Sequence, residues 1–331
     1  MRQEQFVARH QREWVAFEYW LDLRGSPSRE EQKHIGDLLA DEEIPACYRR
    51  ICEQLALARK RGYSPQLVAR LQQLMQRGHN LLYRTPPPRW RRAARFVLAD
   101  FPRWVRSEAA CMWLSAALFY LPLIAIFAAL QWRPELIHGL MSPEQIASVE
   151  SMYDPSASHQ RIGRDAQTDW QMFGVYILNN TSIGLRTFAS GLLACVGAVY
   201  VLIFNGVSIG AVFGHLQQIG YGETLWRFVV GHAPFELTAI VITGGAGLRL
   251  GFNLIAPGQR RRIDALVEAG RKGARICLGA ALMFFIAAFI EAFWSSIATI
   301  PALTKYIVSG VLWVLVLGWL WRGGRGMTDA P

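Results

Sequence analysis

Apolar and polar positions are unevenly distributed along the chain, and the change between them falls near Glu108. Before this residue the sequence is polar and rich in arginine, although Leu67, Leu71 and Leu74 recur at helical spacing on one face. After it, residues 109–132 contain no charged side chain over 24 positions, more than the about 20 residues that a helix needs to cross a bilayer. The pattern therefore predicts an N-terminal helical domain followed by a first transmembrane helix.

Further apolar blocks predict the remaining spans. They cover residues 170–185, 187–222, 228–255, 276–296 and 306–321. If each block crosses the bilayer once, the bundle has six spans and both ends of the chain lie on the same side. A four-span arrangement, in which the segment around Asn179 lies on the membrane or re-enters it, is the alternative.

The predicted fold class is all-α: a polytopic membrane helix bundle of about six spans with an N-terminal cytoplasmic helical domain. We place this domain at residues 1–86, a basic amphipathic juxtamembrane helix at 87–108 and the bundle at 109–331, with an outside loop at 133–169 and a cytoplasmic basic loop at 257–275. The juxtamembrane segment alternates arginine with aromatic and aliphatic residues, which is typical of a helix lying on anionic lipid. A fourth packed helix of the N-terminal domain is the alternative for this segment.

The net charge of +10 is distributed in a way that predicts the orientation of the chain. Seven arginines lie between Arg84 and Arg106, and residues 258–275 hold six basic against two acidic side chains, whereas the loop 133–169 has more carboxylates than arginines. Basic loops stay in the cytoplasm, so both termini are expected there and the loop 133–169 outside. The first residues lack the apolar core of a signal peptide, which agrees with a cytoplasmic N-terminal region. We interpret the basic runs as topological signals and contacts with membrane lipids, and we expect no nucleic acid as a partner.

The sequence holds no HExxH, Walker A or CxxC pattern, which are motifs of soluble enzymes and redox or metal sites. The five cysteines are expected to be free thiols. They are Cys47, Cys52, Cys111, Cys195 and Cys277. Enzyme activity stays open at this point, because an intramembrane hydrolase that uses Glu236 or His232 is a further alternative.

Polar side chains within the predicted spans are the candidates for a functional site. An ionisable group at bilayer depth costs from about 2.5 to more than 10 kcal/mol, so such groups usually face the bundle interior and pair. The set comprises Asn179, Asn180, Arg186, Asn205, His232, Glu236, Arg249 and Glu291. A hydrogen-bonded seam that only locks helices together would use the same residues.

Glu236 is the centre of this predicted site. His232 precedes it by four residues, so the two side chains lie one turn apart on one helix face. An unpaired carboxylate in hydrocarbon would take up a proton, and a partner removes that cost. We therefore expect a basic or amide partner from Arg186, Asn179 or Asn180.

Pro234, between His232 and Glu236, removes a backbone hydrogen bond and favours a kink or a broken helix. A His-x-x-x-Glu pair can hold a metal, but no third ligand is visible in the sequence, so we predict neither a metal nor another cofactor. Arg249 follows about three and a half turns after Glu236 and is expected near the inner headgroups.

Glycines recur at intervals of four in NGVSIGAVFG and again in GGAGLRLG. The set comprises Gly206, Gly210, Gly214, Gly244, Gly245, Gly247 and Gly251. Small residues at this interval let helix backbones approach closely where lipid gives no hydrophobic drive. We predict that these glycines pack against another helix, in the same chain or in a second protomer.

Four ordered motifs carry a resemblance to a known family. They are ILNNTSIGLRTFASGLL, NGVSIGAVFGH, GHAPFELTAIVITGGAGLRLG and AAFIEAF, and together they resemble the stage II sporulation protein M family of integral membrane proteins. The N-terminal run CYRRICEQLALARKRGYSPQLVARLQQLMQRGHNLLYR is similar to the cytoplasmic part of the Gram-negative branch of that family. The family usually reads Pro-His-Gly before the glutamate, whereas here Pro234 follows His232.

The resemblance implies a multi-pass protein of the bacterial cytoplasmic (inner) membrane. In spore formers the family member is a scaffold that holds peptidoglycan-degrading proteins, and Gram-negative relatives often occur beside another small membrane protein and an AAA-type ATPase. We therefore expect an inner-membrane scaffold or assembly protein of a cell-envelope complex, with other envelope membrane proteins as partners. An AAA-type ATPase system and a second copy of the chain are further candidates. The alternative is a membrane transporter, channel or lipid-moving protein that uses the polar site around Glu236.

Overall fold

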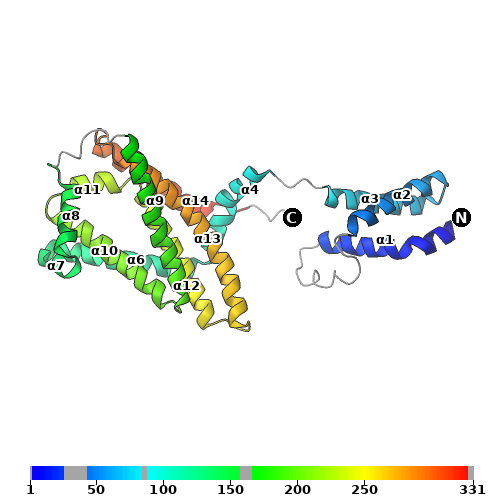
Figure 1. The fold of residues 1–331 in the computed structure, drawn as a ribbon, viewed down its shortest axis with the longest axis horizontal. Helices are drawn as coiled ribbons and strands as arrows, with labels where there is room; N and C mark the ends of the chain where they lie inside the picture. Colours follow the sequence, from blue (N-terminus) through cyan, green and yellow to red (C-terminus); the bar gives the residue numbers. More distant parts are fainter. Residues whose placement is uncertain (1, 26–42, 84–87, 157–165, 327–331) are drawn as a thin grey trace. The chain divides into compact units, whose positions relative to one another are not determined.

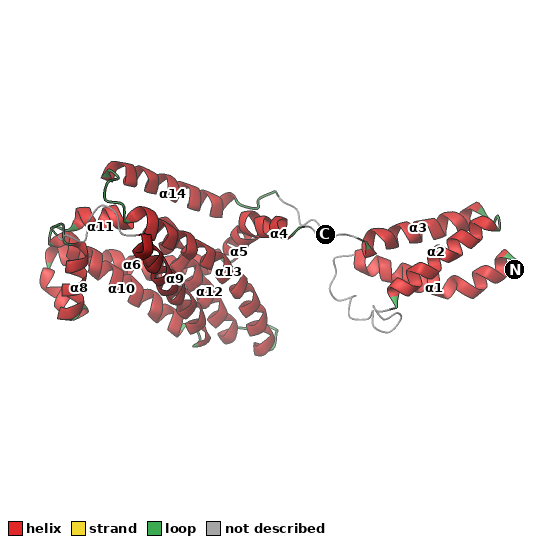
Figure 2. Ribbon diagram, turned by 45° about the horizontal axis from the view of Figure 1, so that its top comes forward, coloured by secondary structure: helices red, strands yellow, loops and turns green. Residues whose placement is uncertain are grey.

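The computed structural model describes residues 2–25, 43–83, 88–156 and 166–326, and it places them in helices and the turns between helices (Figure 1). No strand occurs within these ranges, which confirms the predicted all-α class (Figure 2). The chain divides into two compact units, and the second begins at Trp90.

The first unit is a three-helix domain. Its helices are α1 (Gln3–Gly25), α2 (Ile44–Lys60) and α3 (Pro65–Leu82). Ser64 is the N-cap of α3 and Pro65 fills the first turn, where a missing N–H has no bond to lose. Leu71 and Leu74 of α3 are buried with Trp14 of α1, so this unit has an aromatic and aliphatic core of its own.

The second unit is a helix bundle. In chain order it contains α4 (Arg89–Arg95), the π turn η2 (Phe96–Asp100), α5 (Phe101–Ser107), α6 (Ala109–Trp132), the short turns η3 (Pro134–Leu136) and α7 (Ile137–Leu140), α8 (Pro143–Tyr153), α9 (Ala166–Ala189), η5 (Ser190–Leu192), α10 (Val196–Gln218), α11 (Gly222–Val229), α12 (Ala233–Ile255), α13 (Arg262–Ile290), the π turn η6 (Glu291–Ser295) and α14 (Ala302–Arg322).

Five helices among the described residues are long and apolar enough to cross a membrane. They are α6, α10, α12, α13 with its continuation through η6, and α14. The remaining predicted span, residues 170–185, corresponds to α9. This helix is 24 residues long and packs against α12 and α13, but it carries more polar residues than the five helices above. The chain is therefore a multi-pass membrane protein, as predicted.

Helix α12 lies at the centre of the bundle, in contact with α6, α9, α10, α13 and α14. In the most apolar 18-residue stretch of α12, 78% of the residues are buried inside the protein, whereas the corresponding share is 17% in α6 and in α14. Figure 2 shows α9, α12 and α13 side by side. We call the end of the bundle where α12 begins the Glu236 end and the end where α12 finishes the Arg249 end.

The segment predicted as a juxtamembrane helix packs onto the bundle. Phe101 of α5 is buried against Gly279 of α13, and its ring centroid lies 5.4 Å from that of Trp319 in α14. Arg106 donates hydrogen bonds of 2.5 Å to the carbonyls of Leu320 and Gly323, at the C-terminal end of α14. A guanidinium suits free carbonyls at a helix C-terminus, so α5 and α14 hold each other in place.

Candidate functional site

Three ionisable side chains converge where α12 begins and α13 ends. His232 is the N-cap of α12, Glu236 lies in its first turn, and Glu291 is the first residue of η6. The His232 Nε2 lies 3.7 Å from the Glu236 Oε2, and one ligand atom of each of the three residues lies within 4.8 Å of the others. His232 and Glu291 are 5% and 8% exposed, and the Glu236 side chain is 18% exposed, so the cluster is largely screened from solvent.

The local helix geometry aims these side chains at one another. Pro234 lies in the first turn of α12, so the kink expected from it does not fall inside the helix; the chain instead breaks between α11 and α12, and α12 starts afresh at Ala233. At the end of α13, the π turn η6 contains both Glu291 and Ser295. The Ser295 Oγ lies 3.2 Å from the His232 Nδ1, while the other ring nitrogen faces Glu236.

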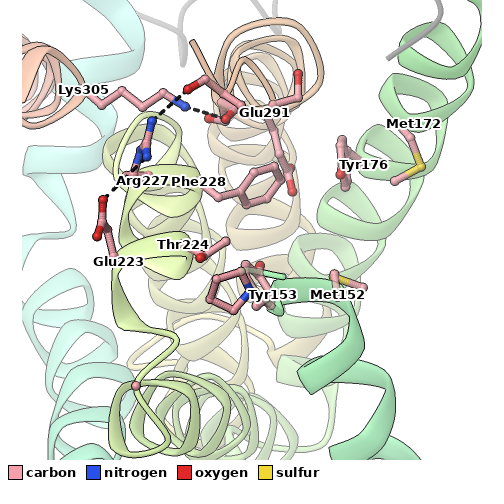
Figure 3. Close-up of a pocket in the computed structure, with 15 residues that line it drawn as sticks. Met152, Tyr153, Met172, Tyr176, Glu223, Thr224, Arg227, Phe228, Glu291 and Lys305 are labelled. Atoms are coloured by element: carbon pink, nitrogen blue, oxygen red, sulfur yellow. Dashed lines mark hydrogen bonds and ion pairs between the residues drawn. The ribbon is translucent and has the colours of Figure 1, made fainter. Parts of the chain in front are cut away.

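A cavity of about 540 Å³ adjoins this cluster (Figure 3). Glu291 and Ser295 line it from η6, Arg227 from α11 and Lys305 from α14. Lys305 is only 2% exposed and donates a hydrogen bond of 2.7 Å to the Ser295 carbonyl. A buried ammonium and a buried carboxylate therefore share one cavity wall.

Two further residues give the cavity its polar lining. Arg227 donates hydrogen bonds to the carbonyls of Ala298 and Ile300, at 2.8 and 3.1 Å, in the loop between η6 and α14. Tyr153 of α8 lies opposite, and burial raises the pKa of its phenol, with the neighbouring Glu291 carboxylate as a second cause. The phenol therefore stays protonated and can donate a hydrogen bond to an anion.

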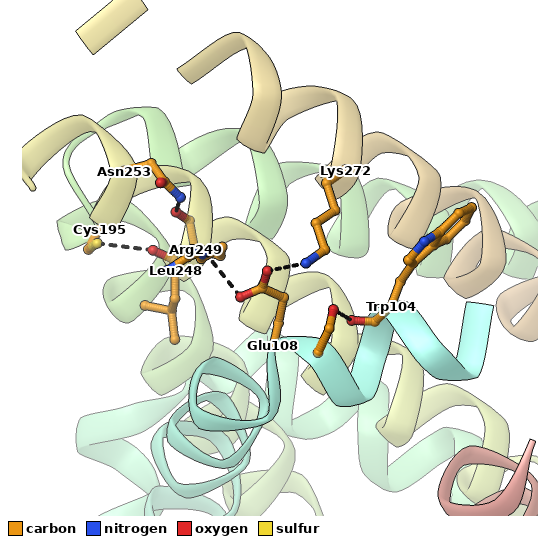
Figure 4. Close-up of polar contacts among 8 residues, drawn as sticks. Trp104, Glu108, Cys195, Leu248, Arg249, Asn253 and Lys272 are labelled. Carbon is orange, nitrogen blue, oxygen red and sulfur yellow. Dashed lines mark hydrogen bonds and ion pairs between the residues drawn. The ribbon is translucent and has the colours of Figure 1, made fainter. Parts of the chain in front are cut away.

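A second polar cluster lies at the Arg249 end (Figure 4). Glu108, the residue before α6, is 8% exposed; its Oε2 lies 3.1 Å from the Arg249 Nε and its Oε1 accepts a hydrogen bond of 2.5 Å from the Lys272 Nζ. This carboxylate joins α6, α12 and α13, because two cations from different helices meet on it. Asn253 donates to the Arg249 carbonyl at 2.8 Å and ends the network.

The remaining predicted site residues do not gather around Glu236. Asn205 of α10 donates to the Val201 carbonyl of its own helix at 2.7 Å, and Arg186 of α9 is exposed on the bundle surface. Asn179 is exposed and donates to the Asn180 side chain at 3.0 Å, while Asn180 itself is 3% exposed.

The expectation that Glu236 pairs with a residue of α9 therefore does not hold within the described part of the chain, where its ion pair is with His232. The reason is the register of the two helices. Gly184 of α9 faces the Thr243 methyl group, which places Asn180 near the level of Ala239. Glu236 lies about one turn beyond that level, next to η6.

Tightly packed backbone separates the two polar clusters. A Cβ on Gly247 would lie 3.1 Å from the Phe188 Cα of α9, and a Cβ on Gly251 would lie 2.8 Å from the Cys195 Cα before α10. Gly245 faces α6 in the same way, through Met112, and Gly244 faces Ser115 and Leu202. Gly247 and Gly251 therefore pack against backbone, whereas Gly244 and Gly245 pack against side chains that leave no room for a Cβ.

Glu291 is one of the predicted site residues, but its position beside Glu236 is not predicted from the sequence. Lys305 and Glu108 are not predicted as site residues at all. Residues 276–321 contain only two charged side chains, Glu291 and Lys305, and they flank one predicted turn. Two isolated charges of opposite sign on either side of a turn indicate that Glu291 and Lys305 lie near each other. Glu108 stands directly before the first span and was assigned to the segment outside it, so its burial could not be read from the pattern.

Comparisons with known proteins agree with the fold and the motifs. Residues 109–296, more than half of the chain, match the family model described as stage II sporulation protein M. Residues 4–84 match a model described as a domain of unknown function. No curated protein and no solved structure matches the chain. The family match confirms the resemblance found in the four ordered motifs.

Proposed function

The chain belongs to the stage II sporulation protein M family, and from this premise we propose that it is an assembly protein of the bacterial inner membrane, which holds partner proteins of a cell-envelope complex through its helix bundle and its N-terminal domain. The observation that carries the proposal is the packing of α12. Between Glu236 and Arg249 this helix is closed against α6, α9 and α10 by contacts that leave no room for a Cβ on Gly244, Gly245 or Gly247. A carrier has to open and close a path through its bundle, whereas such contacts keep helices in one arrangement.

The extent of the cavity also favours an assembly protein over a carrier. It is lined from α8, α9, α11, η6 and the start of α14, all at the Glu236 end, and it does not extend along α12 to Arg249. In this proposal the N-terminal domain is a second binding surface. Ion pairs on its outside join α1 to α2 and α3, and its hydrophobic core is independent of the bundle.

Photo-crosslinking in native membranes tests the proposal. A photo-crosslinking amino acid replaces Val314 of α14, which is 73% exposed, or Arg49 of α2, which is exposed on the N-terminal domain. We expect both positions to crosslink to the same small set of envelope proteins, and mild purification to return them in fixed stoichiometry. Val316 is the matched control, because it lies two residues from Val314 on the same helix but is 3% exposed. Crosslinks to lipid alone, together with purification of the chain by itself, would contradict an assembly role.

A membrane transporter, channel or lipid-moving protein is the second candidate, favoured by the buried charges of Glu291 and Lys305 in the cavity wall. Reconstitution into liposomes separates the two. An assembly protein gives no solute flux and no lipid exchange in the absence of partners. Flux that disappears with Glu236→Gln would favour the second candidate instead.

A further inference from the structure

Three side chains at the Glu236 end offer the donor set of a metal site. His232 supplies an imidazole nitrogen, and Glu236 and Glu291 supply one carboxylate oxygen each, all within 4.8 Å of one another. Donors around a tetrahedral Zn²⁺ stand roughly 3.3–3.6 Å apart, given metal–donor distances of about 2.0–2.2 Å. Small rotations of two glutamate side chains close that difference. We propose that His232, Glu236 and Glu291 bind a divalent transition-metal ion, and that Zn²⁺ fits these donors.

The orientation of the histidine ring supports this assignment. Its Nδ1 lies 3.2 Å from the Ser295 hydroxyl, and its Nε2 faces the Glu236 carboxylate. When Nδ1 carries the proton and donates a hydrogen bond to the Ser295 Oγ, Nε2 presents its lone pair to the space between the carboxylates. Histidines that bind metals are usually held in this way, with the other ring nitrogen hydrogen-bonded.

The balance of charge points in the same direction. Two carboxylates lie close together at a position where Glu291 is 8% exposed and Glu236 18%. Two carboxylates this close repel each other, and a cation between them removes the repulsion. His232 can supply at most one positive charge, and Lys305 lies in the same cavity wall as Glu291 but donates to the Ser295 carbonyl. A divalent cation held by all three side chains would neutralise both carboxylates directly. An imidazole with two carboxylates suits Zn²⁺ and its neighbours better than Mg²⁺ or Ca²⁺, which prefer oxygen donors alone.

The cavity supplies access and a free coordination position. Glu291 lines the cavity of about 540 Å³, so an ion can approach from that side and a water molecule can complete the coordination (Figure 3). Three protein donors with one open position are typical of Zn²⁺ sites that bind a further ligand, and four protein donors are typical of structural ones. Lys305 and Arg227 in the same wall would favour an anionic group as that ligand.

The irregular end of α13 is a further, independent indication. Glu291 and Ser295 are the first and last residues of the π turn η6, and both contribute to the surroundings of His232. A π turn costs hydrogen-bond geometry and occurs frequently where a functional side chain has to be re-aimed. Here the re-aimed side chains are one proposed ligand and the hydroxyl that holds another.

Zinc titration of the full-length protein in detergent tests the site. The chain carries a tag without histidine, is stripped with EDTA, and is titrated with Zn²⁺ against a fluorescent chelator. We expect one Zn²⁺ per chain, and at least tenfold weaker binding in His232→Gln and in Glu291→Gln. His215→Gln is the matched control with wild-type affinity, because His215 lies in a comparable His–Glu pair with Glu150, at 2.7 Å, outside the three-residue cluster.

X-ray absorption on the wild-type zinc-loaded chain decides the matter even if a substituted protein does not fold. We expect nitrogen and oxygen donors at about 2.0–2.2 Å with the outer-shell signal of imidazole. A sulfur shell at about 2.3 Å would assign the ion to the free cysteines and overturn the proposal. Absence of stoichiometric Zn²⁺ binding, or equal binding by all variants, would also overturn it and leave the cluster as a hydrogen-bonded seam.

Discussion

Gly210 of α10 lies directly against the backbone of Leu123 in α6: a Cβ on Gly210 would stand 3.0 Å from the Leu123 Cα. Its neighbours repeat the relationship one turn away on either side. Gly206 faces the Phe119 carbonyl, and Gly214 faces the Phe127 Cα at 3.1 Å. The three glycines thus form one face on which α10 packs against α6 at the distance of backbone contact.

Replacing Gly210 by leucine should force α6 and α10 apart. The inserted side chain meets backbone, which cannot move aside, and overpacking of this kind typically costs about 1–3 kcal/mol. The expected result is a lower melting temperature of the full chain in detergent. Gly310→Leu in α14 is the control, since a Cβ there meets nothing within 4 Å and the melting temperature should stay unchanged. Identical melting of Gly210→Leu and the parent would contradict the packing.

This pair also marks the limit of sequence reasoning. The interval of four between Gly206, Gly210 and Gly214 is a local pattern, so the packing face could be predicted from the chain alone. The identity of the opposite helix could not, because it depends on which spans become neighbours in the folded bundle. A partner in a second protomer was equally compatible with the spacing, and the structure places α6 there.

The same distinction applies to the charged residues. His232 and Glu236 share a face because they are one helical turn apart, which spacing predicts. Glu291 joins them only through the packing of α13 against α12 and the π turn at its end. Glu108 looks like a solvated residue before the first span, yet Arg249 and Lys272 enclose it. Long-range contacts of this kind have no periodic signature.

Glu108→Gln should destabilise the bundle, because the substitution leaves two cations facing a neutral amide. Removing one partner of a buried ion pair costs about 3–5 kcal/mol, but Arg249 and Lys272 are each more than a third exposed, so we expect a smaller loss of about 1–3 kcal/mol. Thermal unfolding measures it. Glu268→Gln is the control, since its ion pair with Arg260 is exposed and should contribute little. Equal melting of both variants would show that Glu108 is solvated.

The N-terminal domain should fold on its own and lose stability in acid through Glu13. Burial alone would raise the pKa of Glu13, but hydrogen bonds from Arg50 and Gln54 outweigh it, and the pKa lies below its ordinary value of 4.5. A carboxylate with a lowered folded-state pKa stabilises the fold above its unfolded pKa, and the contribution is lost as the pH falls through the folded value.

We therefore expect a fragment of residues 1–88 to be helical by circular dichroism and to become less stable to urea between about pH 5 and pH 3. In the Glu13→Gln variant, stability at pH 7 should be lower by up to about 1 kcal/mol and the acid dependence weaker. An unfolded fragment would mean that the domain depends on the bundle. An acid dependence unchanged by Glu13→Gln would assign it to other carboxylates.

The loop that contains α8 should face the outside, with both termini in the cytoplasm, because arginine is concentrated on the other side of the first span. Ser151 is exposed on α8, so a cysteine at this position is accessible to a probe. In a background without the native cysteines, Ser151→Cys should react with a membrane-impermeant maleimide in intact spheroplasts. Glu268→Cys in the basic loop region should react only after permeabilisation. The opposite pattern would reverse the topology.

Helix α9 should cross the membrane, which would make six spans. At the Glu236 end the Trp170 ring lies 4.9 Å from that of Phe293, and at the Arg249 end Gly191, just after α9, meets the backbone of Gly247. The helix therefore runs beside α12 and α13 over their length, and it must cross if they do. Two of the polar residues that lower its mean hydropathy, Asn180 and Thr187, are buried in the bundle and are therefore not exposed to lipid.

Cysteine labelling at the two ends of α9 distinguishes a crossing from a re-entrant segment. Thr168 is exposed at its start, and Leu193, 68% exposed, follows at its end. If α9 crosses, Thr168→Cys reacts from the same side as Ser151→Cys, and Leu193→Cys reacts from the opposite side. Reaction of both from one side would mean that α9 does not cross. With five crossings, residues 323–326 after α14 would then also lie on the opposite side from the N-terminal domain, so a probe at Arg325 gives an independent check of the same prediction.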